Sequence, residues 1–316
     1  MSARQRFARR PFASDRLQAW FARREWRIAP FQQATWDAYR AGESGLVHAP
    51  TGSGKTLAAW LGPLIEAVEQ GNDSDREPLQ VLWVTPLRAL ANDVLGNLAD
   101  AARAMQLAWR VEARTGDTAS SVRQRQRTRP PQALVTTPES LSVWLSYADH
   151  HDALRSLRCV IVDEWHELMG TKRGVQLELC LARLRALNST LRVWGLSATL
   201  GNLDEALQTL MGADHRGRMI QGPAAAPVVV ESIMPHAIER FPWAGHLGVR
   251  LLTQVIDVIE RGGITLLFTN TRSQAELWYR AIVAARIGWI DQVDILHGWF
   301  AMRSRIRGEE EVRRGR

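Results

Sequence analysis

A glycine-rich stretch near the start of the chain has the residue types that bind a nucleotide phosphate. Residues 49–56 read A-P-T-G-S-G-K-T and lie between an apolar run and a helical pattern. Glycines let backbone N–H groups curl around a β-phosphate, and the following helix adds the positive end of its dipole. A chance glycine-rich turn is the alternative, which the correctly placed Gly-Lys-Thr disfavours. We therefore expect a nucleoside triphosphate to contact Thr51, Gly52, Ser53, Gly54, Lys55 and Thr56.

Two adjacent acids follow a later apolar run and could supply the hydrolytic chemistry. Asp163 is expected to hold Mg²⁺ together with the Thr56 hydroxyl, while Lys55 reaches the β- and γ-phosphate oxygens. Glu164 is expected to orient and deprotonate the attacking water, because phosphoryl transfer depends mainly on positioning and charge. Surface acids that cap a helix are the alternative. His166 completes the catalytic candidates, although a lone histidine is more often structural.

Short apolar, β-branched runs alternate with longer helical patterns, and these elements must position the candidate residues. The order strand, helix, strand is typical of a parallel sheet, and strands that are apolar throughout indicate helices on both faces. Ligands of such sheets bind at the carboxyl ends of the strands. We therefore predict an open, doubly wound α/β sheet with strands at residues 46–49, 81–85, 133–136, 159–163 and 193–197.

A segment rich in glycine, proline and alanine, residues 221–227, separates this pattern from a second one. New strand candidates begin at Val228 and at residues 264–268, and a last one lies at residues 293–296. A chain of 316 residues suits two domains of ordinary size. We therefore predict a first domain over residues 1–222 and a second over residues 223–316, whose sheet is unfinished.

Composition favours a protein that folds in water and binds a polyanion. Hydrophobic residues make up 46% of the chain and charged residues 23%, and no apolar run approaches the roughly 20 residues that span a bilayer. We therefore expect no membrane association and a cytoplasmic location. Cys159 and Cys180 lack metal-ligand spacing and are expected to be reduced core thiols. The net charge of +7, mainly from arginine, suits phosphate groups, although a coding genome rich in G and C would also favour arginine.

Further short motifs follow in order, and together they resemble superfamily 2 helicases. D-E-x-H at residues 163–166 and S-A-T at residues 197–199 are similar to motifs II and III. Residues 30–32 resemble the Q motif, and residues 85–90 resemble motif Ia. Residues 115–117 together with 136–141 resemble the Ib group, and residues 267–272 resemble motif IV. The string over residues 163–176 is similar to the large helicase-related family, in its DEXH branch associated with a DNA ligase. This resemblance implies two RecA-like domains, the second incomplete, that use ATP and Mg²⁺.

The resemblance also implies roles outside the phosphate loop. Gln32 would read the adenine edge, and Ser197, Ala198 and Thr199 would couple hydrolysis to nucleic-acid binding. Loops after strands would grip successive phosphates, with ordinary turn and capping chemistry as the alternative. The expected contacts are Arg88, Thr115, Gly116, Thr137 and Pro138 in the first domain and Thr271, Arg272 and Gly298 in the second.

Two further groups of side chains have a structural as well as a functional interpretation. The arginines at positions 123, 125, 127 and 129 form either a solvated helix face or a track beside nucleic acid. Most of the 13 tryptophans, Trp83 among them, are expected to pack in the core rather than to stack on bases.

The function implied by the resemblance is an ATP-dependent DNA helicase or translocase of 3′-to-5′ polarity in DNA repair. Its partners would be single-stranded or tailed duplex DNA, a DNA ligase and other repair proteins. One alternative is a remodeller of RNA or of RNA–DNA hybrids, because phosphate-gripping loops do not specify the sugar. Another is a nucleotide-dependent clamp that binds nucleic acid without unwinding. Arg313 and Arg316 match the core of motif VI but lie in a polar helix pattern, so we expect the arginine finger in a longer protein and weak activity of this form.

Overall fold

A computed structural model describes residues 13–147, 151–213, 216–224, 227–234 and 247–295. The chain separates into two compact units, Met1–Ala226 and Pro227–Arg316. The division lies a few residues beyond residue 222, where the composition changes. Gly298, Arg313 and Arg316, named above as candidates, lie outside the described residues.

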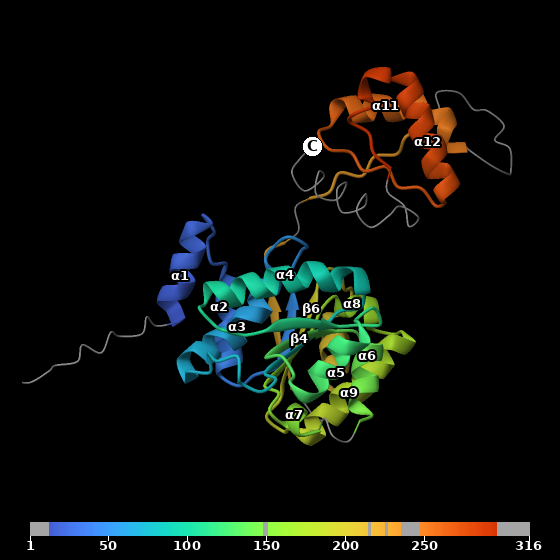
Figure 1. The fold of residues 1–316 in the computed structure, drawn as a ribbon. Helices are drawn as coiled ribbons and strands as arrows, with labels where there is room; N and C mark the ends of the chain where they lie inside the picture. Colours follow the sequence, from blue (N-terminus) through green and yellow to red (C-terminus); the bar gives the residue numbers. More distant parts are fainter. Residues whose placement is uncertain (1–12, 148–150, 214–215, 225–226, 235–246, 296–316) are drawn as a thin grey trace, which may run out of the picture. The chain divides into compact units, whose positions relative to one another are not determined.

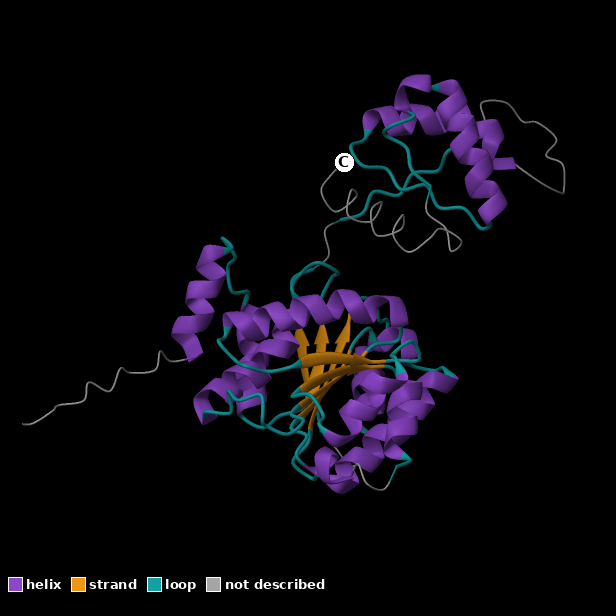
Figure 2. Cartoon of the chain, viewed as in Figure 1, coloured by secondary structure: helices purple, strands orange, loops and turns teal. Residues whose placement is uncertain are grey.

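The first unit is built on a parallel sheet of seven strands in the order β3-β4-β2-β5-β6-β1-β7. All six pairings between neighbouring strands are parallel. A parallel sheet needs crossover helices between its strands, and Figure 2 shows helices on both sides of it. The strands are β1 (Gly45–His48), β2 (Val81–Val84), β3 (Val111–Arg114), β4 (Ala133–Thr136), β5 (Cys159–Val162), β6 (Arg192–Ser197) and β7 (Arg218–Gln221). The predicted α/β class and its five central strands are confirmed.

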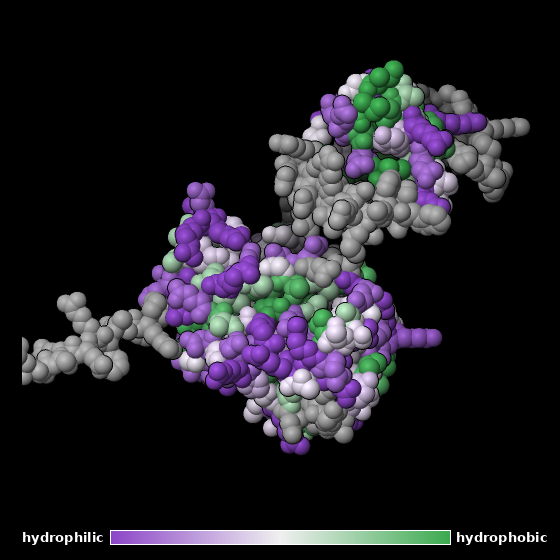
Figure 3. Space-filling view, viewed as in Figure 1, coloured by the Kyte–Doolittle hydropathy of each residue, from purple (hydrophilic) through white to green (hydrophobic). Residues whose placement is uncertain are grey.

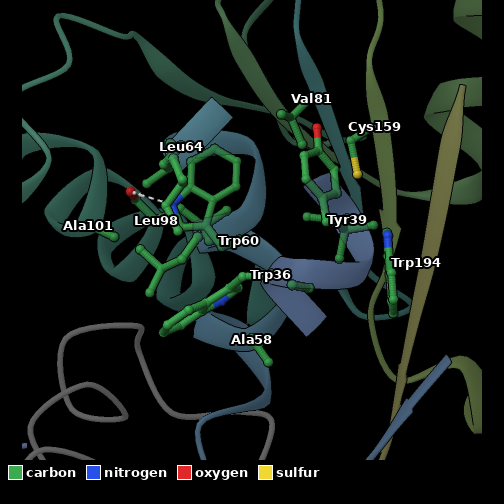
Figure 4. Packing of buried hydrophobic residues seen from close by; sticks show 14 of the residues in the cluster. Trp36, Tyr39, Ala58, Trp60, Leu64, Val81, Leu98, Ala101, Cys159 and Trp194 are labelled. Atoms are coloured by element: carbon green, nitrogen blue, oxygen red, sulfur yellow. Dashed lines mark hydrogen bonds between the residues drawn. The ribbon is translucent and has the colours of Figure 1, made fainter. Parts of the chain in front are cut away.

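One layer of helices packs on the first face of this sheet (Figure 1). The core of this layer consists of side chains from α1–α4 and from every second residue of the strands, because side chains along a strand point alternately to opposite faces. Trp83 and Trp194 lie in this layer, and the Trp60 indole donates a hydrogen bond to the Leu98 carbonyl at 3.1 Å (Figure 4). Burial of these indoles confirms their assignment to the core. The helices are α1 (Ala13–Arg23), α2 (Pro30–Arg40), α3 (Lys55–Gln70) and α4 (Arg88–Ala104).

A second layer covers the opposite face. The strand residues next in sequence, such as Leu82, Val160 and Val193, pack there against apolar side chains of α6–α10. Cys180 lies in this core and Cys159 in the first, and both thiols are free and buried as expected. The polar helix α5 (Ser120–Thr128) contributes no residue to either core. The others are α6 (Pro138–Leu145), α7 (His151–Arg155), α8 (Trp165–Leu168), α9 (Lys172–Leu187) and α10 (Leu203–Met211).

The second unit differs from the expectation, because its described residues contain no strand. The runs that begin at Val228 and Ile264 form no strand, and Val230 and Phe268 are 87% and 86% exposed. The described part of residues 293–296 is not a strand either. A β-branched run becomes a strand only beside a hydrogen-bonding neighbour that also covers its side chains, and no such neighbour lies among the described residues. The elements present are η2 (Leu247–Leu251), α11 (Leu252–Arg261), α12 (Arg272–Ala285) and η3 (Ile287–Trp289).

The face of the first unit seen in Figure 3 is mixed. Hydrophilic side chains cover much of it and surround a smaller apolar area. Within the described ranges, no helix has the length and apolar content needed to cross a bilayer.

Candidate functional site

The phosphate loop connects the end of β1 to the start of α3. Gly52 and Gly54 have φ values of 79° and 92°, a region that favours glycine, and Gly54 caps α3. The Ser53 amide and hydroxyl both donate to the Pro50 carbonyl, at 3.2 and 2.6 Å. The first turn of a helix leaves backbone N–H groups without intrahelical partners, so this loop can bind a phosphate.

Lys55 is the one buried charged residue of the loop, with 7% of its surface exposed. Its ammonium donates to the Ala49 carbonyl at 2.6 Å. Burial lowers the pKa of Lys55, and the negative charges of Glu164 and Asp163 oppose that shift. The structure therefore brings the lysine and the two acids, far apart in sequence, into one electrostatic site.

Gln32 lies directly against the phosphate loop. Its amide oxygen accepts from the Ala29 N–H at 3.0 Å, which ties the start of α2, and its amide nitrogen donates to the Gly54 carbonyl at 3.1 Å. A Cβ atom on Gly54 would lie 2.6 Å from that nitrogen. A glutamine amide has two N–H donors and two acceptor lone pairs, so one of each is left for an adenine edge.

Asp163 follows β5 and is 8% exposed. Its two oxygens accept from the Trp83 indole at 3.3 Å and from the Glu164 amide at 3.0 Å. Burial, and after it the negative charge of Glu164, raises the pKa of Asp163 to about 6. Burial makes the charged carboxylate unfavourable unless a cation lies beside it. Mg²⁺ would be a suitable cation, because it is usually bound by one or two side-chain carboxylates together with phosphates.

Glu164 has a strained backbone and a buried oxygen. Its φ of 44° lies in the left-handed region, which is uncommon for a residue other than glycine and is concentrated at functional sites. Its Oε2 is buried and accepts no hydrogen bond from the described residues, although His166 Nδ1 lies 3.4 Å away. A buried oxygen without a hydrogen bond fits a site for a water molecule or a metal ion.

His166 connects the acids to the end of β6. Its Nδ1 lies 3.2 Å from the Ser197 hydroxyl, which is fully buried. The Ser197 carbonyl in turn accepts a hydrogen bond from the Ala49 amide at 3.0 Å. The D-E-x-H and S-A-T segments are therefore both connected to the phosphate loop. Ala198 follows in a bend, and Thr199 after it is exposed.

Two side chains at this site were not predicted to belong to it. Trp83 was assigned to the core alone, yet its indole N–H contacts Asp163; a polar atom on a buried tryptophan near a strand end was the available signal. His48, the last residue of β1, has a buried Nδ1 that forms no hydrogen bond with the described residues. Burial lowers the pKa of His48, and the positive charges of Lys55 and His166 lower it further.

The candidate nucleic-acid contacts of the first unit fall into two loops. Arg88 and Thr115–Asp117 come together: a Cβ on Gly116 would lie 2.8 Å from the Arg88 guanidinium carbon, and Arg88 pairs with Asp117 at 3.5 Å. Thr137 is buried and caps α6, accepting from the Ser140 amide at 3.4 Å.

The remaining contacts have capping geometry or lie in the second unit. Pro138 is buried in the first turn of α6. Thr271 caps α12 by accepting from the Gln274 amide at 3.3 Å, and Arg272 is the first residue of that helix. Capping chemistry, the alternative considered from the sequence, therefore describes Thr137 and Thr271 in this structure.

Comparison with known proteins places this site in a family. Residues 29–206 match the model of the DEAD/DEAH box helicase family. The ATP-dependent helicase Lhr-Core protein 2 of Thermococcus barophilus is 32% identical over 98% of the chain and 39% of its own length. The Lhr helicase/uracil glycosylase of Escherichia coli is 33% identical over 81% of the chain and 19% of its own length.

Solved structures agree with this result. The Mycobacterium smegmatis helicase Lhr, bound to ssDNA and AMP-PNP, superposes with a TM-score of 0.74 at 30% identity, over 97% of the chain and 40% of the Lhr chain. The helicase MrfA bound to DNA has a TM-score of 0.76 at 21% identity, which shows a shared fold. The chain thus spans about two fifths of the length of the first of these relatives. By its sequence match and by the motifs gathered at its strand ends, the chain belongs to the DEAD/DEAH box helicase family.

Proposed function

We propose that this chain is the ATP-binding motor part of a helicase that couples ATP hydrolysis to movement along single-stranded DNA. The observation that carries this proposal is the cluster of Lys55, Asp163 and Glu164, linked through His166 to Ser197. A simple nucleotide-binding protein needs the phosphate loop but has no use for a bridge from the hydrolytic acids to the next strand end. A motor must couple hydrolysis to nucleic-acid binding, and contacts of this kind can carry such coupling.

Each residue of the cluster has a role in hydrolysis. Lys55 would bind the β- and γ-phosphate oxygens, and Thr56 with Asp163 would hold Mg²⁺, which supplies positive charge to the transferring phosphoryl group. Glu164 would orient the attacking water and accept its proton, and its Oε2 has no hydrogen-bond partner among the described residues. Gln32 would bind adenine and, through the Gly54 carbonyl, connect base recognition to the loop.

The nucleic acid would lie across the loops that follow the strands. Arg88, Thr115 and Gly116 would bind one phosphate region, while Thr137 and Pro138 would present the start of α6 to the next. DNA is favoured because the Mycobacterium smegmatis relative is described in complex with ssDNA. Polarity from 3′ to 5′, a role in repair and partners such as a DNA ligase remain proposals that rest on the family resemblance.

The test compares nucleic acids and tails. The protein used is a form extended to the length of the relatives, because weak activity is expected of the present chain without an arginine finger. Its ATP turnover should rise when ssDNA is added and rise less with ssRNA of the same sequence. In strand displacement, a duplex with a 3′ tail should be opened and a duplex with a 5′ tail should not. Greater stimulation by ssRNA would favour the RNA remodeller. Nucleotide-dependent binding without any displacement would favour the clamp.

A further inference from the structure

The loop over residues 115–118 is held by a dense set of its own hydrogen bonds. The Thr115 amide donates to the Thr118 hydroxyl at 2.9 Å, and the Asp117 amide donates to the Thr115 hydroxyl at 3.3 Å. The Thr118 amide closes the turn on the Thr115 carbonyl at 3.2 Å. The Gly116 N–H, in contrast, has no acceptor among the described residues.

Arg123 of α5 binds the outside of this turn. Its Nε donates to the Thr118 carbonyl at 2.7 Å, and its NH2 group donates to the Gly116 carbonyl at 3.1 Å. One guanidinium therefore bridges both carbonyl oxygens. Only arginine has several donors in a rigid plane that can do this.

The neighbouring arginines of α5 are used differently. Arg125 pairs with Glu112 at 2.9 Å, and Arg129, just after the helix, pairs with Asp75 at 2.9 Å. In the described part of the chain, no carboxylate pairs with Arg123. Hydrophilic side chains gather on the face where Figure 1 places α5 (Figure 3). The four arginines are thus not one uniform basic track, because Arg123 binds the turn while Arg125 and Arg129 pair with carboxylates.

The bridge has an electrostatic consequence for a phosphate at this turn. Two carbonyl oxygens close to a phosphate would repel it, and a guanidinium bound to both offsets their partial negative charge. On another side of the turn, Gly116 packs against Arg88 closely enough that any Cβ would meet the guanidinium. The turn therefore holds Gly116, whose N–H has no acceptor among the described residues, against the Arg88 cation, a combination that suits a phosphate oxygen.

We propose that Arg123 is a positioning residue: it holds the turn at residues 115–118 in the shape in which Arg88 and Gly116 bind a backbone phosphate, without contacting nucleic acid itself. This inference rests on the proposed function, because it assigns that turn to the nucleic-acid site. It differs from a basic track, in which every arginine of α5 would contribute equally through its charge.

The variants Arg123→Gln and Arg125→Gln make a matched pair, because both remove one positive charge from the same exposed helix. Binding of fluorescent ssDNA would be measured by anisotropy over a series of salt concentrations. We expect about tenfold weaker binding for Arg123→Gln, as for the loss of a charged hydrogen bond, and a smaller change for Arg125→Gln. The slope of log affinity against log salt should not change for Arg123→Gln, since a direct phosphate contact would lower it by about one.

A second readout reports the turn without nucleic acid. Amide hydrogen exchange of peptides covering residues 115–118 should be faster in Arg123→Gln than in Arg125→Gln, and Arg123→Lys should not restore it, because an ammonium lacks the planar pair of donors. Equal effects of the two glutamine variants, a salt slope reduced by one, or unchanged exchange would each overturn the positioning role. No binding of ssDNA by the unsubstituted chain would overturn the proposed function itself, before any variant is compared.

Discussion

The Asp163→Asn substitution should stabilise the protein when nucleotide and Mg²⁺ are absent. The folded structure raises the pKa of Asp163 to about 6 from 3.8, so the carboxylate is ionised at a cost at neutral pH. A shift of roughly two pKa units corresponds to about 3 kcal/mol of folding free energy, because each unit is worth about 1.4 kcal/mol. An amide of the same shape is neutral, so its burial lacks this ionisation penalty.

The amide also loses one hydrogen bond, which reduces the gain. The Trp83 indole and the Glu164 amide donate to different oxygens of Asp163, and asparagine can accept from only one of them in this geometry. That loss is worth about 1 kcal/mol, so the net gain should be about 2 kcal/mol at pH 7.5.

The pH dependence has a defined sign. The folded protein binds the Asp163 proton more tightly than the unfolded chain does, so the stability of the unsubstituted protein should rise as the pH falls from 7 towards 4. In Asp163→Asn this component is absent, and the difference between the two proteins should shrink or reverse at pH 5.

The assay is urea unfolding followed by tryptophan fluorescence, in EDTA, at pH 5 and 7.5. Asp204→Asn, an exposed aspartate in the first turn of α10, makes the same change of charge and should be neutral or slightly destabilising. The reasoning is refuted if Asp163→Asn is no more stable than the unsubstituted protein at pH 7.5, or if their difference is the same at both pH values.

Three further substitutions test separate parts of the site, and ATP turnover is measured in the extended form that carries an arginine finger. Glu164→Gln should leave nucleotide binding intact by calorimetry and lower ATP turnover by about 10²- to 10⁴-fold; normal turnover would show that another group activates the water. His166→Ala removes the contact with Ser197 at 3.2 Å, so stimulation of turnover by ssDNA should fall towards none while nucleotide affinity persists, and full stimulation would contradict the coupling role. Asp117→Asn removes the carboxylate that competes for Arg88, so ssDNA should bind a few-fold more tightly by anisotropy, about the effect of an exposed ion pair; weaker binding would be the opposite of our expectation.

The central sheet and the nucleotide site could be predicted because their signals are local. The strand that ends at Val162 is apolar on both faces, as the buried centre of a parallel sheet requires, and Asp163 must then lie at its carboxyl end. The loop that contains Gly54 needs positive φ values, and the glycines in the sequence indicate such values. Neither inference needed knowledge of distant contacts.

The features that were missed depend on partners far away in the sequence. The edge strands β3 and β7 read V-E-A-R and R-M-I-Q, and their polar residues interrupt the apolar pattern by which a strand is recognised. Conversely, the run at Ile264 has strand composition but no neighbour among the described residues to pair with. The contact of Trp83 with Asp163 spans 80 residues, and the grip of Arg123 on the turn depends on where α5 lies. Composition records neither of these relations.

The most direct test of the account is calorimetric titration of the chain with AMP-PNP in the presence of Mg²⁺. The unsubstituted chain should bind, and Lys55→Ala should bind at least about tenfold more weakly, because it removes a charged contact with the phosphate oxygens. Arg88→Ala, which lies outside the nucleotide site, should bind as the unsubstituted chain does. Equal affinity of Lys55→Ala and the unsubstituted chain, or no binding by either, would contradict the assignment of residues 49–56 as the site of ATP.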